Sequence, residues 1–242
     1  MAGRHLKRGL LLYGAPGTGK TLTAMYLAGR MAQRTVILIT GSGMGLIPQA
    51  CRLARVLQPA TIVLEDVDLV AEERTRQEPG CCAALFELLN EMDGLAQDAD
   101  ILFVLTTNRP EILEPALAAR PGRIDLAVEI PLPDAECRRR LFDLYGKGMA
   151  IDQPAATAMI DRTEGVSAAF IRELLRKAAL FAAAGSDGEL RIGSDHLEQA
   201  LGELVLAGGE MTRVLLGAKA GSLADPLPRS GFSAVGGVAR HF

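Results

Sequence analysis

A glycine-rich segment near the start of the chain has the residue types and the spacing that phosphate binding needs. Gly14 is followed after four residues by Gly19-Lys20-Thr21, with an apolar run before the segment and a helix-forming run after it. Glycines let consecutive backbone N–H groups surround an anion, and the positive end of the following helix adds to the attraction. We expect Lys20 to reach the β- and γ-phosphates of a nucleotide, and the Thr21 hydroxyl to bind Mg²⁺. The predicted nucleotide-binding residues of this loop are Gly14, Ala15, Pro16, Gly17, Thr18, Gly19, Lys20, Thr21 and Leu22.

Two further groups of polar residues follow predicted buried strands. The apolar run 61–64 ends in Glu65-Asp66-Val67-Asp68, and the run 101–105 ends in Thr106-Thr107-Asn108. In an open parallel sheet, ligands bind at the carboxyl ends of the strands. We therefore expect both groups to lie beside the phosphates.

Each of these motifs has a purely structural alternative. A glycine turn between a strand and a helix would explain two of the loop glycines, but not the Gly-Lys-Thr ending in this frame. The acidic group at 65–68 could instead cap the next helix. The presence of the phosphate-loop pattern favours the nucleotide-binding interpretation of both.

The order of the predicted elements indicates a parallel α/β sheet flanked by helices. Strands at 9–13, 36–39, 61–64, 101–105 and 127–130 alternate with helices at 19–33, 49–57, 81–92 and 114–119. After the sequence Pro131-Leu132-Pro133 the pattern is almost entirely helical, with helices at 134–145, 155–162, 167–184 and 194–206, and with Ser167 and Ser194 as N-caps. We therefore divide the chain into an α/β nucleotide-binding domain at 1–132, a small helical domain at 133–207 and a linker or flexible tail at 208–242.

Composition narrows the function classes. The 242 residues are 49% hydrophobic and carry a net charge of −3, which argues against nucleic acid as the main partner. Four cysteines, Cys51, Cys81, Cys82 and Cys137, lack metal-ligand spacing and indicate free thiols in a reducing compartment. No apolar run is long enough to span a membrane. We expect a cytoplasmic protein with no membrane partner.

Taken together, the motifs resemble the AAA family of ATPases, which are ring-forming remodelling machines with a P-loop NTPase fold and a helical lid. The resemblance covers about residues 6–206 and includes several segments in the family's order. Beside the phosphate loop, these are Asn90-Glu91-Met92-Asp93-Gly94, Thr106-Thr107-Asn108-Arg109-Pro110, Pro115-Ala116-Leu117, Arg120-Pro121-Gly122-Arg123-Ile124-Asp125, Ile130-Pro131-Leu132-Pro133-Asp134, Gly165-Val166-Ser167-Ala168-Ala169 and Lys177-Ala178-Ala179-Leu180.

The resemblance implies a role for each candidate site residue. Glu65 would hold Mg²⁺, Asp66 would polarise the attacking water, and Asn108 would sense the γ-phosphate. Arg120 and Arg123 match the arginine fingers that one subunit offers to its neighbour's nucleotide, although two surface arginines around a Pro-Gly turn are the alternative. The remaining positions are Tyr145, Ala168 and Ala169, which match residues near the sugar and base, and for Tyr145 a core role is the alternative.

Three features depart from the family pattern. Most members carry Asp-Glu where this chain has Glu65-Asp66, and the shorter Asp66 would place its carboxylate about 1.5 Å further from the water, where 1 Å can cost about 10²-fold in rate. A subgroup resembling the mitochondrial Rieske-protein translocases has the same Glu-Asp order. The segment 40–58 lacks the aromatic residue that threading members use, and offers only Met44, Leu46 and Ile47.

The third departure concerns the ends of the chain. No Val-Gly-Gly or Ile-Gly-Gly turn precedes the first strand, yet Phe232-Ser233-Ala234-Val235-Gly236-Gly237 looks like the segment that opens a family module. The hypothesis is that the tail begins a second ATPase module, and coincidence within a glycine-rich tail is the alternative.

We therefore expect an AAA module that binds and hydrolyses Mg-ATP and remodels a protein client. The full-length protein is expected to assemble with itself as a homo-hexamer, and a monomer is the alternative for an isolated fragment. The alternative is a scaffold that binds ATP and oligomerises but turns ATP over slowly because of the acid order. A nucleic-acid motor is disfavoured by the net charge and by an aromatic content of only 4%.

Overall fold

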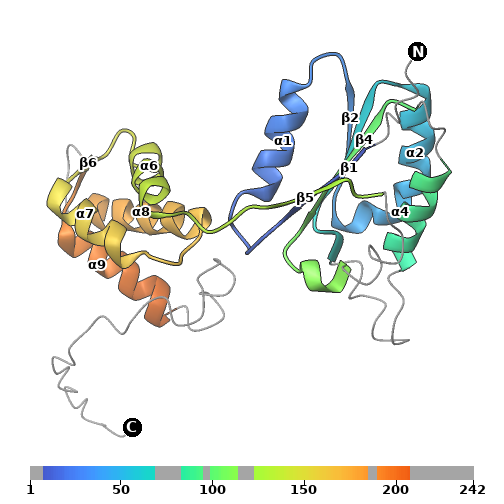
Figure 1. Ribbon diagram of the computed structural model, residues 1–242. Coiled ribbons are helices and arrows are strands. Elements are labelled where there is room, and N and C mark those ends of the chain that lie inside the picture. Colours follow the sequence, from blue (N-terminus) through green and yellow to red (C-terminus); the bar gives the residue numbers. More distant parts are fainter. Residues whose placement is uncertain (1–7, 69–82, 95–98, 114–122, 185–189, 208–242) are drawn as a thin grey trace, which may run out of the picture.

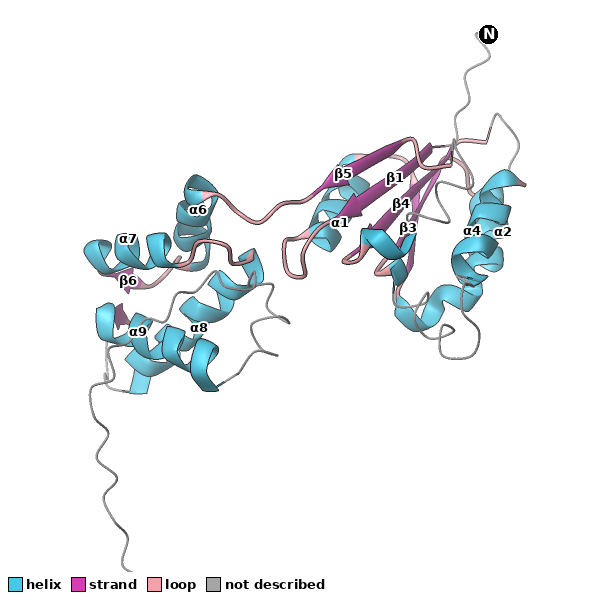
Figure 2. Ribbon diagram, turned by 60° about the horizontal axis from the view of Figure 1, so that its bottom comes forward, coloured by secondary structure: helices cyan, strands magenta, loops and turns pink. Residues whose placement is uncertain are grey.

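The computed structural model describes residues 8–68, 83–94, 99–113, 123–184 and 190–207. A five-stranded parallel sheet with helices on both faces is followed by a separate group of helices, and the segment around residues 130–134 connects the two (Figures 1 and 2). The predicted α/β fold class is confirmed.

The sheet places the ends of three strands at one edge. Its strands are β1 (Arg8–Tyr13), β2 (Thr35–Ile39), β3 (Ala60–Leu64), β4 (Ile101–Thr107) and β5 (Leu126–Glu129), in the order β2-β3-β4-β1-β5. Every pairing is parallel. Within this register, Tyr13 lies opposite Thr107 on one side and Glu129 on the other. The loop after Tyr13 therefore starts beside the carboxyl end of β4.

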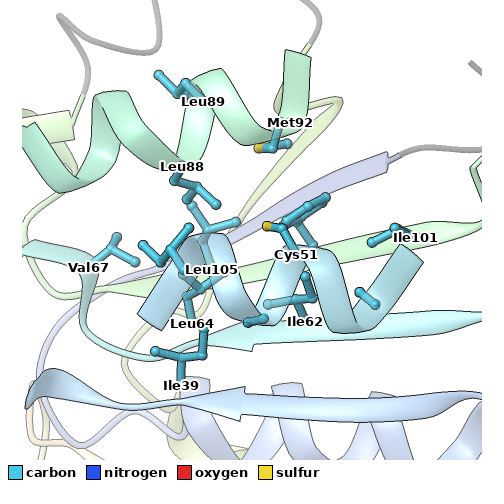
Figure 3. Close-up of a cluster of buried hydrophobic side chains, with 14 of the residues drawn as sticks. Ile39, Cys51, Ile62, Leu64, Val67, Leu88, Leu89, Met92, Ile101 and Leu105 are labelled. Carbon is cyan, nitrogen blue, oxygen red and sulfur yellow. The ribbon is translucent and has the colours of Figure 1, made fainter. Parts of the chain in front are cut away.

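The central strands are buried on both faces, as expected for a parallel sheet covered by helices. Helix α1 (Lys20–Arg30) covers one face, while α2 (Ile47–Val56) and α4 (Ala83–Asp93) cover the other (Figures 1 and 2). Successive side chains of a strand point to opposite faces. Accordingly, Val63 packs towards Ala24 of α1, whereas Ile62 and Leu64 pack with Cys51 of α2 in the larger core (Figure 3).

The segment between β2 and α2 is helical, although the sequence pattern predicted a helix only from residue 49. Residues Gly41–Leu46 form a 3₁₀ helix, and α2 begins directly afterwards at Ile47. Met44 and Ile47 are buried in the core at 4% and 2% exposure, whereas Leu46 is 57% exposed. Met44 and Ile47 were wrong as candidates for gripping a polypeptide, because their side chains stabilise the packing of α2 on the sheet. Of the three, only Leu46 faces solvent.

The helices after residue 133 pack around a hydrophobic core of their own. They are α6 (Ala135–Tyr145), α7 (Gln153–Arg162), α8 (Ala168–Ala184), α9 (Ser194–Gly202) and a π-helical turn, η2 (Glu203–Ala207). Phe142, Phe170 and Leu174 lie within this core. Because the core contains no residue of the sheet, it agrees with a division of the chain near Pro133.

Polar caps define where several of these helices begin. Asp134 accepts a hydrogen bond from the N–H of Cys137 at 2.7 Å, and the Ser167 hydroxyl accepts one from Phe170 N–H at 3.2 Å. The predicted cap at Ser167 is thus confirmed, but the one at Ser194 was wrong. Ser194 is already the first residue of α9, Gly193 is the cap, and the Gly193 N–H donates to Nδ1 of His196 at 3.2 Å.

A second, two-stranded parallel sheet was not predicted. Its strands, β6 (Ala150–Ile151) and β7 (Arg191–Ile192), join the segments that precede α7 and α9. Two-residue strands are too short to show an alternating pattern, which explains why the sequence did not indicate them.

Several predicted features lie outside the described residues. These are the helix at 114–119, Arg120, Cys81, Cys82 and the tail at 208–242. Among the described helices, none has the length and apolar character needed to span a lipid bilayer.

A pair of glycine substitutions tests how tightly β1 meets the segment before β5. The Gly9 N–H donates to Asp125 Oδ2 at 3.0 Å, and a Cβ at Gly9 would lie 2.0 Å from the backbone oxygen of Arg123. Gly9→Ala should therefore lower the free energy of unfolding by about 1–3 kcal/mol through overpacking.

Gly29→Ala serves as the matched control, because a Cβ at Gly29 meets nothing within 4 Å in helix α1. This variant should gain up to about 1 kcal/mol from helix propensity. Chemical denaturation of both variants provides the measurement, and equal midpoints for the two would contradict the close approach.

Candidate functional site

The predicted phosphate loop connects β1 to α1 in a conformation that its glycines make possible. Gly14, Gly17 and Gly19 have φ values of 148°, 74° and 104°, which residues with a Cβ rarely adopt. Gly19 is the N-cap of α1, and no acidic residue occupies the first turn of that helix. The positive end of α1 is therefore available to an anion held in the loop.

Lys20 is a buried cation at the first position of α1. Its side chain is 5% exposed, and Nζ donates to the carbonyl oxygens of Gly14 and Ala15 at 3.0 and 2.9 Å. Burial lowers the pKa of the Lys20 ammonium, while the carboxylates of Asp66 and Asp68 act in the opposite direction. Among the described residues, the hydrogen-bond acceptors of this buried ammonium are neutral carbonyls, so it is well suited to bind an anionic phosphate.

The ends of β3 and β4 bring Asp66 and Asn108 together, as predicted. Asn108 Nδ2 donates to Asp66 Oδ1 at 3.1 Å, and the Asp66 N–H donates to the Thr106 hydroxyl at 3.0 Å. Asp66 has a positive φ of 49°. Burial, followed by the charge of Asp68, raises the pKa of the Asp66 carboxyl, against the effects of Lys20 and the Asn108 hydrogen bond.

Residues of the sheet and of the helical group line one cavity of about 550 Å³. The sheet side contributes Asp66, Asn108 and the loop residues Pro16, Gly17, Gly19, Lys20, Thr21 and Leu22, and the helical side contributes Tyr145, Ala168 and Ala169. The size falls within the range of small-molecule sites. The structure therefore brings most of the predicted site residues to one cavity.

The helical group closes directly on the phosphate loop. The Ala169 N–H donates to the carbonyl oxygen of Gly17 at 3.1 Å. A Cβ at Gly17 would lie 2.7 Å from both Ala169 Cβ and Ser167 Oγ. Only a glycine therefore permits this approach, in addition to satisfying the positive φ.

Sequence reasoning missed three charged residues of this cavity. Arg172, Glu173 and Arg176 line it from the next turns of α8. Arg176 donates two hydrogen bonds of 2.7 Å to Glu173. These hydrogen bonds from Arg176 lower the pKa of the Glu173 carboxyl. The signal was present in the sequence, because positions three and four residues after Ala168 and Ala169 share their helix face.

Glu65 does not line the cavity, although it directly follows β3. Its N–H donates to the Ile39 carbonyl at 2.9 Å. Within the described part of the chain, no cluster of three or more His, Cys, Asp or Glu side chains could hold a metal on its own. The roles of Glu65 and Thr21 at a metal stay predictions.

Arg123 lies away from the cavity of its own chain. Its Nε is 2.5 Å from Oδ1 of Asp93, at the end of α4, and this partner raises the pKa of the guanidinium. Both side chains remain about one quarter to one third exposed, at 26% and 33%. The position of Arg123 outside the cavity agrees with a role towards another molecule. Arg120 is not among the described residues.

A parallel sheet with this loop at the carboxyl end of β1, between β4 and β5, defines a P-loop nucleotide-binding module. Residues 10–132 match the model of the ATPase family associated with various cellular activities (AAA). The chain belongs to the AAA family, which confirms the predicted resemblance.

Individual relatives agree with this assignment. The chain is 35% identical over 188 residues to the proteasome-activating nucleotidase of Methanothermobacter thermautotrophicus, covering 72% of this chain and 46% of the relative. It is 34% identical over 213 residues to the ATP-dependent zinc metalloprotease FTSH 11 of Arabidopsis thaliana, covering 84% and 26%. The chain thus spans about half or less of the curated relatives that it matches.

A solved structure also supports the fold. The crystal structure of the FIGL-1 AAA domain in complex with ADP matches with a TM-score of 0.65 and 25% identity, over 80% of this chain and 70% of that one.

A substitution of Lys20 tests the phosphate loop. Lys20→Met should weaken the binding of ATP about 10- to 100-fold, because a charge-assisted hydrogen bond contributes about 1.5–3 kcal/mol. Arg52→Met, which removes one positive charge from an exposed position on α2, is the control and should bind ATP normally. Isothermal titration calorimetry measures both, and equal affinities would contradict the proposed contact.

Proposed function

We propose that this chain is an AAA ATPase module that hydrolyses Mg-ATP and, as part of an oligomeric ring, remodels a protein client. One observation supports this proposal most directly. Lys20, Asp66 and Asn108, which follow or begin three separate elements of the sheet domain, meet in a cavity that the helical group closes.

The shape and charge of the cavity suit a nucleoside triphosphate. The glycine loop, the N-terminus of α1 and the buried ammonium of Lys20 together favour phosphate. From the helical side of the same cavity, Tyr145, Ala168 and Ala169 provide small and aromatic surfaces that we propose for the sugar and base. The proposed lid, residues 133–207, would thereby sense whether nucleotide is bound.

The available oxygen donors fit Mg²⁺. Mg²⁺ usually keeps several waters and uses one or two protein ligands together with substrate phosphates, so a cluster of three carboxylates is not required. Thr21 has an exposed side chain that lines the cavity, and Glu65 follows the neighbouring strand, so we propose these two as its protein ligands. When bound, the ion would neutralise charge on the phosphates.

Asp66 and Asn108 are proposed to hold the attacking water. Their side chains are joined at 3.1 Å and both line the cavity, so one water can accept from the amide and donate to the carboxylate. Holding the water in line with the γ-phosphate supplies proximity, and Lys20 stabilises negative charge on the transferring group.

Arg120 and Arg123 are proposed to complete the site of a neighbouring subunit. Arg123 projects from the segment before β5, outside its own cavity, and Asp93 restrains its guanidinium. An arginine supplied by a neighbour is worth about 10³–10⁵ in rate where it has been measured in NTPases. Hydrolysis would then depend on assembly.

A protein client is proposed from the relatives, whose names describe proteasome activation and proteolysis. Leu46, on the 3₁₀ helix after β2, is exposed and could contact a client, but its aliphatic side chain offers less area than an aromatic one. We therefore expect weaker gripping than in members with an aromatic residue there.

Phosphate release with Mg-ATP, measured across a range of protein concentrations, tests the ATPase proposal. Turnover per chain should rise with protein concentration, because each site needs an arginine from another copy. Asp66→Ala should lower kcat about 10²- to 10⁴-fold, the usual contribution of a general base. Arg123→Ala should lower it about 10³-fold or more.

Arg140→Ala controls for loss of a surface arginine, since Arg140 is 75% exposed and pairs only with Glu136 among the partners described for it. It should retain full turnover. Absence of turnover at every concentration, with ATP binding intact, would instead support the slowly hydrolysing scaffold.

A further inference from the structure

Asp68 is a buried acid next to the site that the proposed mechanism does not use. Its side chain is only 3% exposed, and it does not line the cavity. It lies two residues beyond Asp66, and Val67 between them is buried in the large core, which anchors this part of the chain. A buried carboxylate is costly unless it is well hydrogen-bonded, so its partners indicate its role.

Both described partners of Asp68 belong to the end of β4. Oδ1 accepts from the Thr107 hydroxyl at 2.8 Å and from the Asn108 N–H at 3.2 Å. The Thr107 hydroxyl oxygen in turn accepts from the Arg109 N–H at 3.0 Å. Asp68 therefore fixes three consecutive residues, with Asn108 in the middle.

These hydrogen bonds complete a reciprocal link between the ends of β3 and β4. The backbone N–H of Asp66 is held by the Thr106 hydroxyl of β4, and the backbone N–H of Asn108 is held by the Asp68 carboxylate that follows β3. The Asn108 side chain then donates to Asp66 at 3.1 Å. With both backbones fixed, the distance between the amide and the carboxylate that face the cavity is fixed as well.

We propose that Asp68 is a positioning residue for hydrolysis, which acts through the backbone of Asn108 to hold its amide against Asp66. This inference rests on the proposed ATPase function. Asp68 itself touches neither the nucleotide nor the attacking water. Its removal frees the Asn108 N–H and the Thr107 hydroxyl inside the protein, so the segment 107–109 shifts to find new partners.

Asp68→Ala should lower kcat about 10²-fold, the cost of roughly 1 Å of misplacement at a reacting group. The Kd for ATP should stay within about threefold, because the lost interaction concerns the chemical step and not ground-state binding. Asp68→Asn keeps the Oδ1 acceptor and the side-chain shape, so it should retain most of the turnover.

Asp100→Ala is the matched control for a purely structural role. Asp100 precedes the same strand, β4, and pairs with Arg34 at 2.7 Å at the opposite end of the sheet. Its loss should reduce stability without lowering kcat. Thermal unfolding of both variants shows that the comparison is made between folded proteins.

A double-substitution cycle shows whether Asp68 works through Asn108. In the Asn108→Ala background, Asp68→Ala should cause no further loss of kcat, since the amide that it positions is gone. Hydrogen exchange of the Asn108 backbone amide provides a readout without turnover. That amide should exchange faster in Asp68→Ala and at the original rate in Asp100→Ala.

Three results would overturn the inference while leaving the ATPase function intact. The first is that the losses of kcat from Asp68→Ala and Asn108→Ala multiply in the double variant. The second is that the kcat of Asp68→Ala is no lower than that of Asp100→Ala. The third is that the Asn108 backbone amide exchanges at an unchanged rate in Asp68→Ala. Absence of turnover in the unaltered chain at all protein concentrations would overturn the proposed function, and the positioning role with it.

Discussion

The parallel pairing of β1 between β4 and β5 is the constraint on which the site depends. The phosphate loop after β1 and the polar residues after β4 can contact the same ligand only if the two strands end at the same level. The pairing of Tyr13 with Thr107 ensures this. The pairing is stable because both faces of the central strands are buried, with Leu12 and Val104 in one core and Leu11 and Leu105 in the other. Beyond the last paired residues, side-chain hydrogen bonds of Thr106 and Asp68 continue the link between the strand ends. Core packing thus determines where the polar residues lie, and the polar network determines how they point.

The helical group contacts the sheet domain over a much smaller surface than the strands and helices of the sheet domain share with one another. Ala169 reaches the phosphate loop through one backbone hydrogen bond to Gly17, and Ala169 and Ser167 occupy the space that a side chain at Gly17 would fill. The hydrophobic core of the helical group shares no residue with the two cores that flank the sheet. Movement of one unit against the other therefore breaks few apolar contacts, and a ligand that binds both sides of the cavity can shift their arrangement with modest binding energy. This is the physical basis on which nucleotide state could be converted into motion of the lid.

The sequence was sufficient for the parts of the fold whose physical signal is local or periodic. Strands such as 61–64 and 101–105 appear as short β-branched runs, and the phosphate loop combines glycine spacing with Lys20. The features it missed depend on tertiary contacts. Burial of Met44 follows from how the 3₁₀ helix packs on the sheet, the β6–β7 pairing joins residues about 40 positions apart, and the Gly193 cap requires His196 to turn back. The acidic run 65–68 directly follows β3, as predicted, but which acid faces the cavity and which is buried depends on backbone geometry that no residue pattern encodes.

The conformation of Asp66 bears on the reversed acid order. A shorter acid withdraws its carboxylate from the water only if the backbone is the same for Asp and Glu at this position. At Asp66, however, φ is 49°, a left-handed conformation that costs most residues about 1–2 kcal/mol and that Asp adopts more readily than other acids or alkyl residues. The N–H of Asp66 is bound by Thr106 and its carboxylate by Asn108, so the surrounding structure holds this conformation at both ends. Asp66 lines the cavity in this arrangement, whereas Glu65 does not. Substitution of Asp66 by the longer Glu would extend the side chain but would make the left-handed backbone conformation less favourable. Side-chain length alone therefore does not determine where the reacting carboxylate lies.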